Sequence, residues 1–150
     1  GAMATSGWVS DGTGWYYFAA SGRLAGNGWM WESGSWYYLT GGRMTEGWLL
    51  DRGTWYYMDS RTGAMRTGWV QVDDRWYYFE PSGAMATGWL NSGDSWYYMS
   101  ANGAMSTGWL NDRGAWYYMD STGVMVTGTV SIDGRSSLFS SSGQWVGYAS

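Results

Sequence analysis

Short apolar runs alternate with polar turn residues along the chain, and the same arrangement returns about every twenty residues. Each unit begins with Gly-Trp, passes through a short polar stretch, and ends with Trp-Tyr-Tyr and an apolar residue. Segment 69–79 is typical, with Trp-Val-Gln-Val, then Asp-Asp, then Arg-Trp-Tyr-Tyr-Phe. Aromatic and β-branched residues on both sides of a tight polar turn predict a β-hairpin.

The two tryptophans of a unit are seven residues apart in all six full units. The pairs are Trp8 and Trp15, Trp29 and Trp36, Trp48 and Trp55, Trp69 and Trp76, Trp89 and Trp96, and Trp109 and Trp116. The variation in repeat length therefore falls in the connectors, which follow a Gly-x-Met-x-Thr-Gly pattern. A lone hairpin is marginally stable in water, whereas stacked hairpins can bury one another's faces. The pattern predicts a stack of rigid hairpins joined by variable connectors.

Side chains on a strand alternate between its two faces, which assigns each aromatic residue of a hairpin to a side. Trp69, Trp76 and Tyr78 fall on one face, and Tyr77 falls on the other. We expect the first tyrosine of each Trp-Tyr-Tyr triplet to pack in the core. These tyrosines are Tyr16, Tyr37, Tyr56, Tyr77, Tyr97 and Tyr117.

The last unit departs from the repeat. Thr129 stands where the first tryptophan would be, and Ser136-Ser137-Leu138 stands where the triplet would be. A divergent terminal repeat is expected of a cap, which has no following neighbour to cover. We therefore predict one domain over residues 1–150, with six full repeats from about residue 7 to 128 and a capping repeat over 129–150.

Composition narrows the kind of core and the kind of partner. The 150 residues include 14 Trp, 13 Tyr and 25 Gly, and aliphatic residues are scarce, so the core must be built from aromatic rings and Met. The net charge is −4, which argues against a nucleic-acid partner because such binding needs clustered positive charge. We find no apolar run long enough to span a membrane and no signal peptide, and we expect no membrane insertion.

Catalysis is not expected from this chain. It has no His, no Cys and no Lys, and its acidic residues fall mostly at hairpin tips and in connectors, where we interpret them as solvated turn formers. Their spacing does not recur as a ligand set would, so we expect no metal site and no cofactor.

The Gly-Trp pair, the seven-residue step to Trp-Tyr-Tyr, and the following Gly-x-Met together resemble the choline-binding repeat, also called the cell-wall-binding repeat. The resemblance covers nearly the whole chain from about Gly7, and six copies with identical spacing make it specific. It implies an all-β fold, a solenoid in which tandem β-hairpins form a left-handed superhelix. It also implies ligand sites between consecutive hairpins, each built from two Trp of one hairpin, the second Tyr of the next triplet, and a connector Met.

Carried onto this sequence, the resemblance implies five complete choline-binding cages. They are Trp8, Trp15 and Tyr38; Trp29, Trp36 and Tyr57 with Met44; Trp48, Trp55 and Tyr78 with Met65; Trp69, Trp76 and Tyr98 with Met85; and Trp89, Trp96 and Tyr118 with Met105. The first has Leu24 where a Met is expected. A sixth, with Trp109, Trp116 and Met125, meets Leu138 in place of the tyrosine, and we expect it to be weak or absent.

Aromatic cages suit a quaternary ammonium ion, because that cation has no N–H to donate and is attracted to the electron-rich faces of indole and phenol rings. The resemblance thus implies a non-catalytic module, secreted and wall-associated, that binds choline or phosphocholine on a teichoic acid-type polymer. It is compatible with a targeting module of a larger cell-wall hydrolase, and a homodimer through terminal hairpin edges stays open. The alternative function is a glucan- or other carbohydrate-binding repeat module, since sugars also stack on Trp and Tyr.

Overall fold

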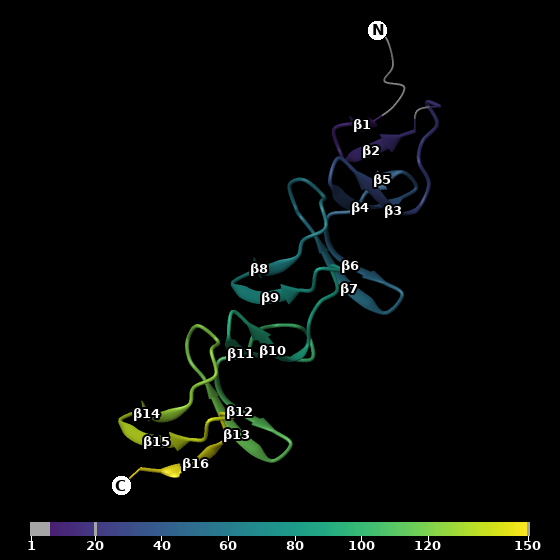
Figure 1. Cartoon of the computed structure of the whole chain (residues 1–150). Helices are drawn as coiled ribbons and strands as arrows, with labels where there is room; N and C mark the ends of the chain where they lie inside the picture. The colour runs from purple at the N-terminus through teal and green to yellow at the C-terminus, as the bar shows by residue number, and fades with distance from the viewer. Residues whose placement is uncertain (1–6, 20, 150) are drawn as a thin grey trace. The chain divides into compact units, whose positions relative to one another are not determined.

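The chain is built of β-hairpins in tandem, and Figure 1 shows them as successive pairs of antiparallel arrows. The computed structural model describes residues 7–19 and 21–149, and these contain strands and turns but no helix. The strands are β1 Gly7–Ser10, β2 Trp15–Phe18, β3 Gly28–Glu32, β4 Ser35–Thr40, β5 Arg43–Met44, β6 Gly47–Asp51, β7 Thr54–Met58, β8 Gly68–Val72, β9 Arg75–Phe79, β10 Gly88–Ser92, β11 Ser95–Met99, β12 Gly108–Asp112, β13 Ala115–Met119, β14 Gly128–Ile132, β15 Arg135–Phe139 and β16 Trp145–Tyr148. The predicted all-β fold of tandem hairpins is confirmed.

Two-residue turns close most hairpins. The residue pairs at these turns have positive φ, as at Arg52 and Gly53 (φ 52° and 81°) and at Asp133 and Gly134 (54° and 81°). This is the backbone geometry of a type I′ turn, whose twist matches the twist of the flanking strands. The first hairpin instead turns over residues 11–14, where the Asp11 carboxylate accepts hydrogen bonds from the backbone N–H groups of Thr13 and Gly14. The turns sit where the sequence predicted them.

The strand register separates the aromatic residues as alternation requires. In β10 and β11, Trp89 lies opposite Tyr98, and Leu90 lies opposite Tyr97. The first tryptophan of each full hairpin packs edge-on against the second tyrosine of its own triplet, with ring centroids 5.1 Å apart for Trp89 and Tyr98. The predicted faces are therefore correct.

The core is built largely from the residue at the end of the second strand of each hairpin after the first. Met58, Phe79, Met99 and Met119 are completely buried there, and Leu39 and Phe139 are nearly so. The largest completely buried hydrophobic side chains are thus Met and Phe, as the composition predicts, although Leu39, Val70, Ala104 and Ile132 are buried as well.

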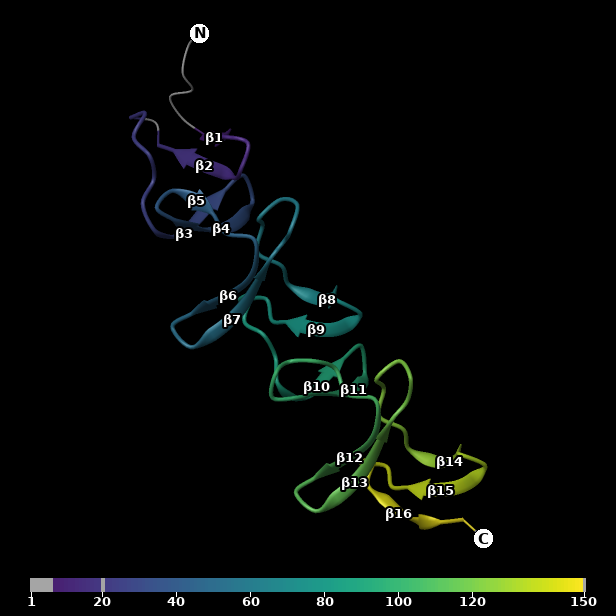
Figure 2. The same cartoon turned by 180° about the vertical axis from the view of Figure 1, so that it is seen from behind.

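Contacts divide the chain into two compact units, one of Gly1–Gly68 with Phe79–Met85 and the other of Trp69–Tyr78 with Ala86–Ser150. In the first unit, five strands form a sheet in the order β1-β2-β5-β4-β3, and β6 pairs with β7. In the second, β10 pairs with β11, β12 pairs with β13, and β14, β15 and β16 form a three-stranded sheet. Seen from behind in Figure 2, β16 runs along β15 at the C-terminal end of this unit. The expected single domain and the left-handed superhelix stay predictions.

Connectors that carry a Met join two hairpins through their backbone, as Met65 shows. Met65 forms a β-bridge with Met58 of the preceding strand, while its N–H donates to the Trp36 carbonyl of the hairpin before that (2.8 Å). Met105 and Met125 donate in the same way to the Trp76 and Trp96 carbonyls. Consecutive hairpins are therefore held at a repeated spacing by hydrogen bonds to the connector.

Candidate ligand-binding pockets

Four pockets of the same construction lie in the described part of the chain, with cavity volumes of about 280–380 Å³. Each is lined by the two tryptophans of one hairpin, the first tyrosine of the next triplet, the following connector Met, and a polar residue from the connector beyond. We name each by its first tryptophan. The linings are Trp8, Trp15, Tyr37, Met44, Arg61 and Thr62; Trp29, Trp36, Tyr56, Met65 and Ser82; Trp69, Trp76, Tyr97, Met105 and Thr122; and Trp89, Trp96, Tyr117, Met125, Ser141 and Ser142.

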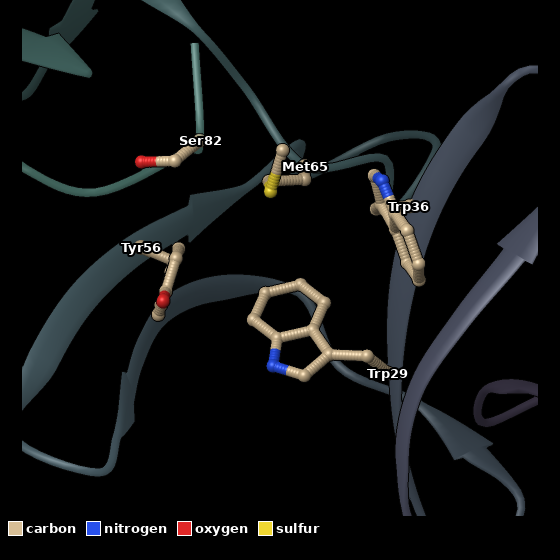
Figure 3. Close-up of a pocket in the computed structure, with 5 residues that line it drawn as sticks. All are labelled: Trp29, Trp36, Tyr56, Met65 and Ser82. Atoms are coloured by element: carbon tan, nitrogen blue, oxygen red, sulfur yellow. The ribbon is translucent and has the colours of Figure 1, made fainter. Parts of the chain in front are cut away.

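The Trp29 pocket shows the arrangement. Figure 3 places the Trp29 and Trp36 indoles, the Tyr56 phenol and the Met65 thioether around one open space. The two indoles are nearly perpendicular, at 87° with centroids 6.5 Å apart, and Tyr56 meets Trp29 edge-on at 4.8 Å. Trp36 is 40% exposed although it belongs to a packed hairpin. An exposed indole beside a hollow is available to a ligand rather than committed to the core.

The two tryptophans share a face because the second one pairs across the hairpin with a residue two positions after the first, and cross-strand partners and alternate residues lie on the same face. In β3 and β4, Trp29 lies opposite Tyr38, and Trp36 lies opposite Trp31. That face is covered by the opposite face of the next hairpin, which presents the first tyrosine of its triplet. The pocket therefore belongs to the junction between two hairpins, as the sequence indicated.

The connector Met is seated on a glycine of the next connector. A Cβ built on Gly83, whose φ is +89°, would collide with the Met65 side chain, and Gly63 stands in the same relation to Met44. The positive φ and the close approach both require glycine here. The Gly-x-Met pattern thus reflects two requirements: a positive φ at the glycine and close packing of the Met against the glycine of the next connector.

The tyrosines in the pockets differ from those that the resemblance implied. The expected partners were the second tyrosines Tyr38, Tyr57, Tyr98 and Tyr118, whereas Tyr37, Tyr56, Tyr97 and Tyr117 line the pockets. The first tyrosines, which we expected to pack in the core, pack edge-on against the preceding tryptophans and also line the pockets, while choline binding by the second tyrosines stays a prediction. The reason is the alternation itself: a second tyrosine lies on the face of its own tryptophans, so the first one faces the preceding hairpin.

The connector methionines are likewise assigned one junction earlier than expected. Met44 lines the Trp8 pocket instead of the Trp29 pocket, and Met65 lines the Trp29 pocket instead of accompanying Trp48. Met105 lines the Trp69 pocket rather than the Trp89 pocket, which Met125 lines. Leu24 stands at the position of a connector Met, because it bridges Phe18 and packs against Gly42 as Met65 bridges Met58 and packs against Gly83. The connector folds back over the preceding junction, a feature that spacing alone does not reveal.

One of the five expected cages, that of Trp48 and Trp55, is not among the four pockets described above. Trp48 and Trp55 meet in the first unit, with centroids 6.1 Å apart, and Met85 donates its N–H to the Trp55 carbonyl. A cage formed by Trp48 and Trp55 with Tyr78 stays a prediction, because Tyr78 belongs to the second unit. The expected place of Met65 in that cage stays a prediction too.

At the last junction, the residue in the position of the first tyrosine is Ser137, which is buried. Trp145 packs against Trp109 there, with centroids 6.4 Å apart. Leu138 is exposed and occupies the position of a second tyrosine, so Ser137 rather than Leu138 is the substitution that changes this junction.

Indole N–H groups at three of the pockets donate to the next hairpin. Trp29 Nε1 donates to Asp51 (3.0 Å), Trp89 Nε1 donates to Asp112 (3.0 Å), and Trp69 Nε1 donates to the Ser92 hydroxyl (3.3 Å). These bonds satisfy the polar edge of a half-buried tryptophan and leave its face free for a ligand.

The first junction uses a different donor, the Tyr17 hydroxyl, which donates to Glu32 (2.8 Å). This bond to Glu32 raises the pKa of Tyr17. The Trp8 pocket also differs in having the cationic side chain of Arg61 in its lining. The four pockets thus share a shape but not an electrostatic environment.

The chemistry of these pockets is that of binding rather than catalysis. Their linings offer ring faces, a thioether, a few hydroxyl groups and, in the Trp8 pocket, the Arg61 guanidinium, without a paired acid and base. Among the described residues, no three His, Cys, Asp or Glu side chains gather where they could hold a metal ion. In the same residues, no helix is long and apolar enough to cross a membrane.

Two family models match the chain. The choline-binding repeat matches residues 66–108, and the cell wall binding repeat matches residues 6–24, 27–41, 46–65 and 107–125. Together they leave few residues unmatched between 6 and 125. Among curated proteins, none matches the chain.

Solved structures of related proteins are also similar. Choline binding protein F from Streptococcus pneumoniae, solved with a peptidoglycan analogue, is 43% identical over 94% of this chain, with a TM-score of 0.85. The pneumococcal cell wall endolysin from phage Cp-1, solved with choline, is 36% identical over 81% of this chain, with a TM-score of 0.61. The chain spans 46% and 37% of the lengths of these two proteins.

The repeated motif, the hairpin junctions and the family matches agree from residue 6 to residue 125. The chain belongs to the choline-binding repeat family of cell-wall-binding modules.

Proposed function

We propose that the four described pockets bind the choline groups of a cell-wall polymer. The observation that carries the proposal is the construction of each pocket, in which three aromatic rings and a thioether surround a space open to solvent. A quaternary ammonium ion gains from ring faces and has no N–H that would need an acceptor. The family membership and the choline complex of the phage endolysin support the same ligand.

Single pockets are expected to be weak. A cation on an aromatic face gains roughly 0.5–2 kcal/mol per ring, so three rings correspond to affinities near the millimolar range, or about −4 kcal/mol. Several pockets on one chain, facing a polymer that repeats its ligand, raise the effective affinity by roughly 10²–10⁴-fold. A repeated weak site therefore suits a decorated polymer better than a free small molecule.

The wider role proposed for the chain follows from that polymer. A module that binds choline or phosphocholine on a teichoic acid-type polymer acts outside the cell. We therefore propose that this chain is secreted and wall-associated. The resemblance to an endolysin supports a role as the targeting module of a larger cell-wall hydrolase. Pairing of two copies through terminal hairpin edges is a further proposal, supported by the unpaired edge that a terminal strand presents.

Intrinsic tryptophan fluorescence tests the ligand. We expect a saturable change with choline at millimolar concentration, since the pocket indoles are partly exposed and a bound choline would contact them directly. The neutral isostere 3,3-dimethyl-1-butanol, which has the same shape without the charge, should bind far more weakly. A response to glucan oligosaccharides without a response to choline would instead establish the carbohydrate-binding alternative.

A further inference from the structure

The indole N–H bonds of the pockets end on one repeated position, the last residue of the first strand in the following hairpin. In β6 this residue is Asp51, in β12 it is Asp112, and in β10 it is Ser92. Each lies next to the two-residue turn, opposite Thr54, Ala115 and Ser95 respectively. The position is the same, but its charge is not.

These three side chains are half-buried, which strengthens their electrostatic effect. A charge that is partly removed from water interacts with a nearby cation more strongly than an exposed one does. A carboxylate that accepts an indole N–H forms a charge-assisted hydrogen bond and places negative charge at the edge of the ring. The ring face then presents a more negative potential to a cation in the pocket. A serine hydroxyl holds the same N–H but adds no charge.

We infer that this position sets the cation affinity of the pocket in the preceding junction. Asp51 and Asp112 make the Trp29 and Trp89 pockets the tighter sites for a quaternary ammonium ion, and Ser92 makes the Trp69 pocket a weaker one. The inference rests on the proposed function of the pockets and adds a ranking among them. It also assigns a second role to acidic residues that the sequence presents simply as turn formers.

The residues act through the tryptophans rather than by touching the ligand, so they are positioning residues. A purely structural role would affect any ligand of the same shape, whereas an electrostatic role affects only a cation. Choline and 3,3-dimethyl-1-butanol separate the two, because they have the same shape and differ in charge.

The experiment follows the assigned ¹⁵N–¹H indole resonances of Trp29, Trp69 and Trp89 while each ligand is added to the whole chain. For the wild type we expect half-saturation with choline at a lower concentration for Trp29 and Trp89 than for Trp69. In Asp51→Asn, which keeps an acceptor oxygen but loses the charge, choline binding at Trp29 should weaken about fivefold. In Ser92→Asp, choline binding at Trp69 should strengthen by a similar factor. The neutral isostere should bind each variant as it binds the wild type.

Asp94→Asn is the matched control. Asp94 is an exposed residue of the β10–β11 turn with a φ of 69°, a conformation that Asn tolerates, and its substitution removes the same charge beside Ser92. It should leave the Trp69 titration unchanged. Equal weakening of both ligands in Asp51→Asn, or no gain in Ser92→Asp, would overturn the inference while leaving choline binding in place. If no pocket of the wild type responds to choline, the proposed function itself fails.

Discussion

Replacing Tyr56 with Leu tests the assignment of the first tyrosine to the pocket. Tyr56 packs edge-on against Trp29 at 4.8 Å and 70°, and it lines the Trp29 pocket. Leu keeps an apolar side chain in the strand but removes the ring face that a cation would contact. The loss of one ring, worth roughly 0.5–2 kcal/mol, should weaken choline binding at this pocket by about two- to thirtyfold.

Tyr57→Leu is the matched control, because Tyr57 makes the same kind of contact in a different place. Its ring meets Trp48 at 5.2 Å and 73°. An edge-to-face pair contributes about 0.5–1.5 kcal/mol, so both variants should lose similar stability. Only Tyr56→Leu should weaken binding at the Trp29 pocket.

The assay is a choline titration followed by the Trp29 indole ¹⁵N–¹H resonance, with thermal unfolding of each variant measured alongside. Unfolding shows whether the two substitutions perturb the fold equally. Normal binding in Tyr56→Leu together with weakened binding in Tyr57→Leu would refute the assignment and restore the second tyrosine to the cage.

Three further predictions follow from the packing and charge of the connectors. Gly83→Ala should destabilise the chain by at least about 1 kcal/mol more than Gly68→Ala, by thermal unfolding, because both have positive φ but only Gly83 touches the preceding connector Met. Equal losses would contradict this. Arg61→Ser should tighten choline binding at the Trp8 pocket about threefold, and Arg113→Ser should not, since a like charge leaves the pocket lining. The backbone N–H of Arg61 donates to the Asp59 carboxylate and holds the pKa of Asp59 below its ordinary 3.8. The ionised carboxylate therefore stabilises the fold fully above pH 3.8, and this stabilisation is lost as the pH falls through the lowered pKa. Asp59→Asn should flatten this part of an acid-unfolding curve, and an unchanged curve would count against it.

The sequence was sufficient to predict the hairpins, because their signals are local. The seven-residue Trp–Trp step and the turn pairs determine the register, and the register determines which residues share a face. The location of the sites at junctions also followed, since one hairpin face carries both tryptophans and needs a partner.

The alternation of side chains along each strand also indicates which tyrosine of the triplet lines the pocket. Placing Tyr78 with Trp69 and Trp76 on one face already directs Tyr77 to the opposite face. By the same alternation Tyr97 faces Trp69 of the hairpin before it. The resemblance implied the other tyrosine, whose binding role stays a prediction. Extending the alternation to the stacked faces gives the tyrosine that lines the pocket.

The methionines and the charge pattern required the fold itself. Met65 reaches the Trp29 pocket because its connector folds back and bonds to the Trp36 carbonyl, a contact between residues 29 positions apart. The bond from Trp29 to Asp51 likewise joins separate hairpins. No local pattern in the sequence encodes either approach.

A crystal structure of the chain with choline would test the central claim most directly. The account predicts a choline in the Trp29 pocket, with its quaternary nitrogen within about 6 Å of the ring centroids of Trp29, Trp36 and Tyr56. Choline bound away from the hairpin junctions, or an empty Trp29 pocket at saturating choline, would contradict it.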